Sequence, residues 1–79
     1  MSNPARILEQ LRSGPTDLSV ADVRTLLAWL GWEIREGKGS HFVVTSSLGN
    51  VISVPHKHQR VKRGYLKLLL KEIDRSGGT

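Results

Sequence analysis

The spacing of the apolar residues changes at Gly31, and this change constrains the fold more than any other feature of the sequence. Before Gly31 the apolar positions lie three or four residues apart, which is the period of one face of an α-helix; they are Val23, Leu26, Leu27 and Leu30. After Gly31 apolar and polar residues alternate, which is the period of a half-buried strand. Ser19 suits the N-cap of the helix and Gly31 its C-terminal cap. We therefore expect a helix from Ser19 to Leu30, followed by a strand over 32–36.

Two segments rich in turn-forming residues divide the next part of the chain. Gly37 and Gly39 flank Lys38, and glycine adopts positive φ without steric cost, so this segment predicts a hairpin turn. Residues 46–50, Ser-Ser-Leu-Gly-Asn, also consist mostly of turn formers. We expect a second strand at about 40–46 and a third over 51–54. Pro55 would end the third strand because it has no backbone N–H to donate.

Two more helices flank these elements. Asn3 can cap a helix over 3–13, which Gly14 and Pro15 would end, and residues 15–17 are predicted to be a linker. Helical spacing returns after a basic connector at 56–60 and predicts a last helix from Lys62 to Arg75. The sequence thus predicts an α+β fold, in which a three-stranded antiparallel sheet carries helices on one face and leaves the other face open.

The length and composition indicate one small domain. A chain of 79 residues has room for a single hydrophobic core. It has no cysteine, which excludes disulfides and thiolate metal sites. The N-terminus lacks a basic-then-apolar signal pattern, and no apolar run approaches the roughly 18 residues that span a bilayer. We expect a soluble, cytoplasmic protein that does not bind membranes.

Basic residues are concentrated in the second half of the chain. The chain has seven acidic residues, and none of them lies between Gly37 and Lys71. The same window holds seven basic residues: Lys38, Lys57, Arg60, Lys62, Arg63, Lys67 and Lys71. A positive stretch of this kind is typical of proteins that bind polyanions such as nucleic acids. A solvated, lysine-rich surface explains the same pattern, so charge alone leaves both interpretations open.

His41 lies at the start of the predicted second strand, directly after the glycine-rich turn. Side chains alternate between the faces of a strand, so if Phe42 and Val44 point into the core, His41 points to the open face. A histidine in that position could act as a general acid or base near neutral pH. On spacing alone, an ordinary surface histidine is the simpler interpretation.

The other two histidines, His56 and His58, are separated by one residue. They could place two imidazoles on one side of an extended segment. No carboxylate or cysteine lies near them in the sequence, so a surface pair or an RNA-contacting pair is favoured over a metal site. We expect neither a metal nor another cofactor.

Four segments together resemble the HicA toxins, which are small mRNA interferases paired with HicB antitoxins. The resemblance covers about Ser19 to Ile73, with the Gly-Ser-His step as its most specific part. It implies a single domain with a small double-stranded-RNA-binding-like fold, a core over 19–73, and an N-terminal extension helix and linker over 1–18. The segments are Trp29-Leu30-Gly31-Trp32, Gly37-Lys38-Gly39-Ser40-His41, Val51 to Pro55-His56, and Lys62-Arg63-Gly64-Tyr65-Leu66 with Leu69-Leu70-Lys71.

The resemblance also implies an activity. Such a protein would be an endoribonuclease that acts on mRNA and is inhibited by a HicB-like antitoxin, and the catalytic histidine of the family falls on His41. Metal-free cleavage can use the 2′-hydroxyl of RNA as the nucleophile, with His41 exchanging a proton and cations stabilising the charge on the phosphate. Trp32 and Phe42 are assigned to the core rather than to a base-stacking platform. The candidates for RNA contact are Lys38, Ser40, Lys57, Arg60, Lys62 and Arg63.

Two other functions remain open at this point. A non-catalytic RNA-binding module would use the same basic face and leave RNA intact. A structural adaptor would use that face to bind an acidic protein. The two differ from a ribonuclease in that neither needs His41 for chemistry.

Overall fold

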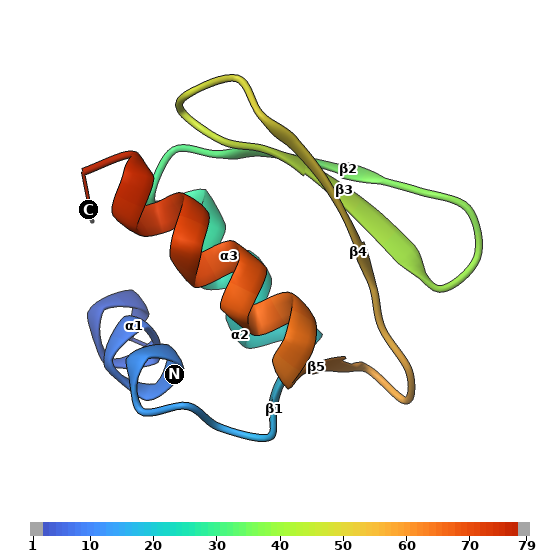
Figure 1. The fold of residues 1–79 in the computed structure, drawn as a ribbon. Helices are drawn as coiled ribbons and strands as arrows, with labels where there is room; N and C mark the ends of the chain where they lie inside the picture. Colours follow the sequence, from blue (N-terminus) through green and yellow to red (C-terminus); the bar gives the residue numbers. More distant parts are fainter. Residues whose placement is uncertain (1–2, 78–79) are drawn as a thin grey trace.

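The computed structural model describes residues 3–77, and its helices and strands follow one another in the order shown in Figure 1. The predicted succession of two helices, three strands and a last helix is confirmed, and so is the α+β class. Two short strands were not predicted, one before the second helix and one before the third. The elements are α1 (Pro4–Arg12), β1 (Asp17–Ser19), α2 (Val20–Trp29), β2 (Glu33–Glu36), β3 (His41–Thr45), β4 (Val51–Pro55), β5 (Arg60–Lys62) and α3 (Arg63–Arg75).

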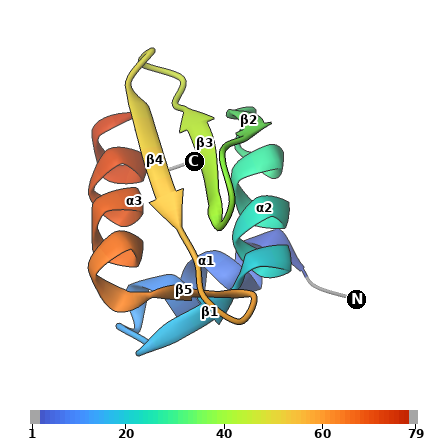
Figure 2. The ribbon, with the colours of Figure 1, turned by 90° about the vertical axis from the view of Figure 1, so that its right-hand side faces the viewer.

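The main sheet is an antiparallel meander in the order β2-β3-β4, as predicted (Figure 2). Glu36 lies opposite Phe42 across the first hairpin, and His41 lies opposite Pro55 across the second pair. The helices α2 and α3 lie on one side of this sheet (Figure 1). The arrangement is consistent with the double-stranded-RNA-binding-like fold that the sequence indicated.

The caps of α2 explain why this helix was predicted from the sequence. The Ser19 hydroxyl accepts a hydrogen bond from the Asp22 amide at 3.1 Å. At the other end Gly31 has a φ of +84°, its amide donates to the Ala28 carbonyl at 3.0 Å, and the Trp32 amide donates to the Leu27 carbonyl at 3.0 Å. This pair of bonds is the Schellman motif, which needs a residue in the left-handed region and therefore favours glycine.

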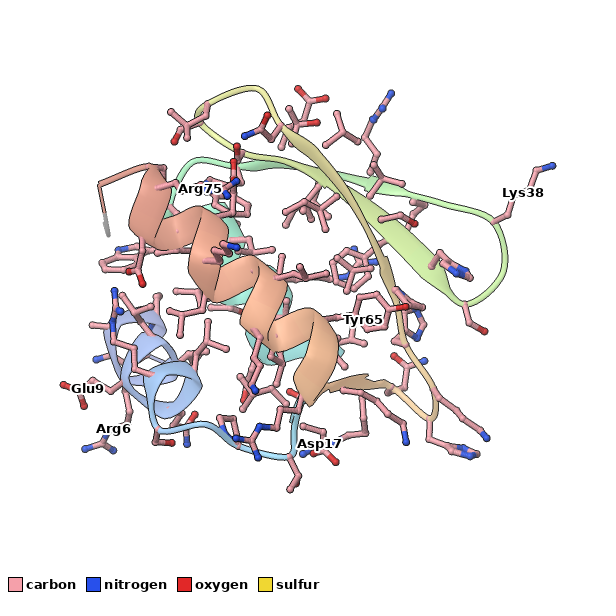
Figure 3. All side chains as sticks on the ribbon, in the orientation of Figure 1. Arg6, Glu9, Asp17, Lys38, Tyr65 and Arg75 are labelled. Carbon is pink, nitrogen blue, oxygen red and sulfur yellow. The ribbon has the colours of Figure 1, made fainter. Side chains whose placement is uncertain are left out.

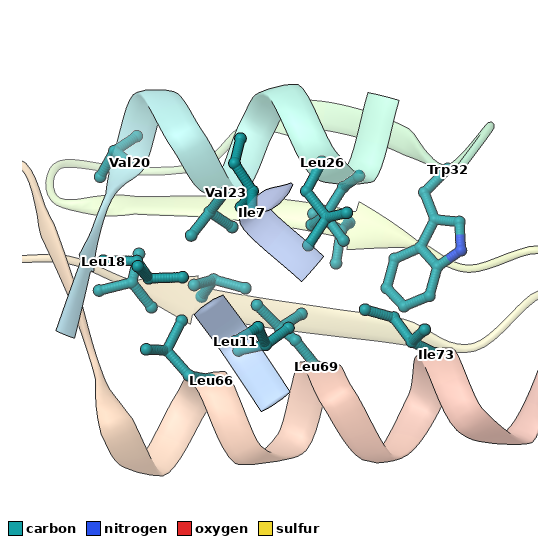
Figure 4. Close-up of a cluster of buried hydrophobic side chains, with 14 of the residues drawn as sticks. Ile7, Leu11, Leu18, Val20, Val23, Leu26, Trp32, Leu66, Leu69 and Ile73 are labelled. Atoms are coloured by element: carbon teal, nitrogen blue, oxygen red, sulfur yellow. The ribbon is translucent and has the colours of Figure 1, made fainter. Parts of the chain in front are cut away.

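The hydrophobic core fills the space between the main sheet and the helices (Figure 4). Alternation along β3 turns Phe42 and Val44 inward, and both are fully buried. Complete burial of such a side chain stabilises the fold by about 1.5–3 kcal/mol. Trp32 closes one end of the core beside Ile73. The indole Nε1–H of Trp32 finds no hydrogen-bond partner among the described residues, at a cost of about 1–3 kcal/mol.

Strands β1 and β5 form a second, two-stranded antiparallel sheet. Its central pair, Leu18 and Val61, is buried in the core. The prediction of a linker over 15–17 was therefore wrong at Asp17, and the predicted connector over 56–60 ends in a strand at Arg60. Each strand is three residues long with one buried residue at its centre, which is too short to show a period in the sequence.

A tight turn joins Lys57 to Arg60 at the beginning of β5. The Lys57 amide donates to the Arg60 carbonyl at 3.0 Å, and the Arg60 amide donates to the Lys57 carbonyl at 2.9 Å. The two central residues, His58 and Gln59, have φ of 53° and 62°. Positive φ at both positions is the type I′ turn, which usually contains Asn and Gly. This turn could not be predicted from the sequence, because neither residue is a usual turn former.

Helix α1 packs on both α2 and α3. It buries Ile7 and Leu11, and the Asn3 side chain caps it by accepting from the Ala5 amide at 2.9 Å. Arg12 pairs with Asp74 of α3 at 2.8 Å. The predicted N-terminal extension helix therefore contributes to the hydrophobic core.

Candidate nucleic-acid interface

His41 is the first residue of β3, and its side chain is exposed on the outer face of the main sheet. The hairpin before it closes tightly, because the Gly37 amide donates to the His41 carbonyl oxygen at 3.1 Å. A Cβ placed on Gly37 would lie 3.1 Å from that oxygen and 3.3 Å from the His41 Cβ. The glycine of the turn thus allows the chain to pass close to His41. The predicted outward position of His41 is confirmed.

The end of β4 lies beside His41. Pro55 is the residue opposite His41 in the sheet, and the His56 amide donates to the Ser40 carbonyl at 2.8 Å. These contacts bring the segment at 55–57 next to Ser40 and His41, although the sequence separates them by about fifteen residues. Lys57 continues this segment and is exposed.

The His56 side chain lies on the other side of the sheet from His41. Its ring centroid is 6.0 Å from that of the buried Phe42. The Arg24 guanidinium lies 5.0 Å from the Phe42 ring centroid and forms an ion pair with Glu36. The His56 ring therefore packs on the inner face of the sheet, at the end of β4. His41 and His56 do not form a pair at one site.

A pocket of about 180 Å³ opens between the end of β4 and the start of α3. Figure 3 shows the Tyr65 side chain reaching from α3 toward β4. The residues that line the pocket are Pro55, His56, Lys57, Lys62 and Tyr65. Sequence reasoning missed this pocket and the contribution of Tyr65, because the turn at 57–60 must fold the start of α3 back beside the end of β4 to form it, and the sequence showed no sign of that turn.

The predicted RNA-contacting residues fall into two groups in the structure. Lys38 projects from the tip of the β2–β3 hairpin (Figure 3), and Lys57 and Lys62 line the pocket near the end of β4. Arg60 instead donates from Nε to the Asp17 carboxylate at 2.9 Å. Arg63 lines a different pocket beside Leu11, Gly14, Pro15 and Leu70, on the side of α1. Lys38 thus lies on the hairpin that precedes His41, and Lys57 and Lys62 share a pocket with Pro55, the residue opposite His41, whereas the two arginines face the N-terminal segment.

Gly64 lies in the first turn of α3. A glycine at this position has two interpretations: close packing on the sheet, or close approach of a phosphate or another chain. A Cβ placed on Gly64 would meet no atom within 4 Å. Packing therefore does not require the glycine, and the first interpretation is wrong.

The described residues, 3–77, contain no group of three or more His, Cys, Asp or Glu placed to hold a metal ion. His58 lies in the exposed turn before β5, whereas His56 contacts Phe42. No helix within the same part of the chain is long and apolar enough to cross a membrane.

Comparison with protein families finds a match over most of the chain. The family model described as the HicA toxin of bacterial toxin–antitoxin systems matches residues 20–74, which is more than half of the chain. No curated protein and no solved structure matches significantly. The matched segment begins after α1 and β1, and it includes the glycine-rich hairpin, His41 and α3. The chain therefore belongs to the HicA family of toxins.

Proposed function

We propose that this protein is a metal-independent endoribonuclease that cleaves mRNA, with His41 as a general acid or base. Toxins of this family are broadly ribonucleases, which supports the reaction class. The assignment of His41 rests on its position. His41 is exposed at the first residue of β3, next to the glycine-rich hairpin and the end of β4. A side chain of this type in this position can contact a bound RNA strand without any rearrangement of the core.

The proposed reaction uses a nucleophile that RNA itself supplies. The 2′-oxygen attacks the adjacent phosphorus while the bond from phosphorus to the 5′-oxygen breaks. One proton leaves the 2′-hydroxyl and one proton is delivered to the 5′-oxygen, which gives a 2′,3′-cyclic phosphate and a 5′-hydroxyl. His41 performs one of these two transfers, a contribution worth about 10²–10⁴-fold in rate.

Nearby cations would stabilise the negative charge that develops on the phosphate. Lys38, Lys57 and Lys62 are exposed and lie around the same end of the sheet. Electrostatic stabilisation of this kind is strongest when the cations are held in place before the reaction. Ser40 is exposed beside His41, where its hydroxyl can contact the substrate. Arg60 and Arg63 would contact RNA only if the bound RNA extends toward β1 and α1.

Cleavage of a defined mRNA in the presence of EDTA tests this proposal. The wild-type protein should cut the RNA and leave 2′,3′-cyclic phosphate ends. His58→Asn is the matched control, because it removes a histidine from the exposed turn and asparagine tolerates the positive φ found there. His58→Asn should cut at the wild-type rate. Intact RNA after incubation with the wild-type protein, together with retained binding, would indicate a non-catalytic RNA-binding module instead.

We also propose that a HicB-like antitoxin inhibits the enzyme by covering the His41 end of the sheet. The family belongs to toxin–antitoxin systems, in which a partner protein restrains the toxin. The net charge of +5 favours a partner whose contact surface is acidic. A complex in which His41 remains accessible to RNA would contradict this mode of inhibition.

A further inference from the structure

We propose that the pocket lined by Pro55, His56, Lys57, Lys62 and Tyr65 binds one nucleobase of the RNA, adjacent to the nucleotide whose phosphate lies at His41. This inference rests on the proposed function insofar as it places RNA at His41. It adds a base-binding site that the sequence did not indicate. Trp32 and Phe42 cannot stack on a base, because both are buried.

The size and lining of the pocket fit a single base. Pockets for drug-sized ligands measure roughly 300–1,000 Å³, so a volume of about 180 Å³ suits a smaller planar group. Tyr65 is 38% exposed, so it is accessible to a ligand. Pro55 and His56, which are half-buried, add two further rings to the lining. Bases stack on rings of this kind whatever their sequence, because every base has a π-face.

The His56 ring is held in position before any ligand binds. Its backbone amide donates to the Ser40 carbonyl, and its ring contacts Phe42, which is fully buried. A ring that is already ordered loses little conformational entropy when a base stacks on it. The pocket thus has one fixed side at the end of β4 and one side formed by α3.

The charge around the pocket matches a nucleotide. Two of the five lining residues, Lys57 and Lys62, are lysines, and none is acidic. Both lysines are exposed, so their ammonium groups can contact the phosphates on either side of a bound base. A nucleotide would use these two cations for its phosphates and the rings for its base.

The pocket lies one strand away from His41. Pro55 lines the pocket and is also the residue directly opposite His41 in the sheet. His41 lies on the outer face of the sheet and the His56 ring on the inner face, but β4 is an edge strand and paired strands lie only about 4.8 Å apart. An RNA strand with a phosphate at His41 would therefore pass around the edge of β4 to place an adjacent base in the pocket. The pocket would therefore hold the base next to the cleaved bond.

Binding of short RNA to proteins that carry His41→Ala tests the proposal without cleavage. In a series of five-nucleotide RNAs, the fluorescent base 2-aminopurine occupies each position in turn, and a second series lacks the base at each position. At one position we expect the fluorescence to be quenched by stacking and the affinity to fall about tenfold when the base is absent. Adding Tyr65→Ala should abolish both effects, and Tyr65→Phe, which keeps the ring, should retain both.

Three results would overturn the proposal. These are equal affinity for intact and abasic RNA at every position, persistence of both effects in Tyr65→Ala, and absence of RNA binding by His41→Ala. Thermal unfolding checks that Tyr65→Ala is folded, which its partial exposure favours. Because these measurements use uncut RNA, they fail or succeed independently of the catalytic role of His41.

Discussion

At the scale of single residues, two glycines near the candidate site serve different purposes. Gly37 allows the hairpin to close on His41, because a side chain there would press on the His41 backbone. Gly64 has open space around it, and nothing in the packing of the described residues requires it. A glycine that packing does not need is consistent with the approach of an RNA backbone to the first turn of α3.

Gly64→Ala should therefore raise the free energy of unfolding by about 0.4–1 kcal/mol, because alanine favours the helix and restricts the unfolded chain. Urea unfolding of the two proteins measures this difference. Gly39→Ala is the matched control and should be destabilising, since Gly39 has a φ of +57°. If RNA approaches α3 at Gly64, the stabilised variant should bind RNA more weakly. An unchanged or lower stability of Gly64→Ala would contradict the open space around this residue.

At the scale of elements, a buried carboxylate ties α3 to the turn between β3 and β4. The side chain of Glu72 is 5% exposed. It accepts hydrogen bonds from the Ser46 hydroxyl at 2.6 Å and the Asn50 amide group at 2.7 Å, and Arg75 lies 3.9 Å away. The pKa of Glu72 is lowered mainly by the hydrogen bond from Ser46, and further by the hydrogen bond from Asn50 and the charge of Arg75. Burial of the carboxylate acts in the opposite direction. The ionised carboxylate therefore stabilises this junction.

A lowered pKa gives stability that is fully present above the ordinary value of 4.5 and is lost as the pH falls through the lowered pKa. Glu72→Gln should accordingly be less stable than the wild type at neutral pH, and the difference should shrink in acid. Urea unfolding at neutral and acidic pH measures both quantities, with Glu9→Gln on the exposed side of α1 as the control. A difference between wild type and Glu72→Gln that does not change with pH would contradict this role.

The parts of the fold that the sequence predicted are those with local signals. The Ser19 cap, the Gly31 motif and the alternation along β3 each depend on residues close together in the chain, so α2 and the main sheet could be predicted. Strands β1 and β5 could not be predicted, because their pairing joins residues 17–19 to 60–62 and each strand alone is too short to show a period. The exposed position of His41 followed from alternation, whereas the pocket that contains Tyr65 depends on tertiary contacts between β4 and α3.

At the scale of the whole molecule, the segment before the matched family region is part of the core. Ile7 and Leu11 of α1 are 2% and 4% exposed, and they belong to the same cluster as Leu66 and Leu69 of α3. A chain of 79 residues buries a limited apolar area, so each core residue accounts for a large share of its stability. Helix α1 thus stabilises the small domain that carries His41.

Leu11→Ala should lower the free energy of unfolding by about 2–5 kcal/mol, as expected for removal of a buried leucine side chain. Arg6→Ala on the same helix is the control and should change stability little, because Arg6 is exposed and points away from the core (Figure 3). Thermal and urea unfolding of both variants provide the comparison. Equal stability of Leu11→Ala and Arg6→Ala would show that α1 does not contribute to the core in solution.

The single-turnover rate of RNA cleavage by His41→Ala, measured in EDTA beside the wild-type protein and His58→Asn, tests the central claim most directly. His41 is exposed on the outer face of β3, so the variant should fold and should bind RNA with nearly unchanged affinity. Its cleavage rate should fall by about 10²–10⁴-fold, because one proton transfer then lacks its catalyst. Cleavage by His41→Ala at the wild-type rate would contradict the catalytic role of His41.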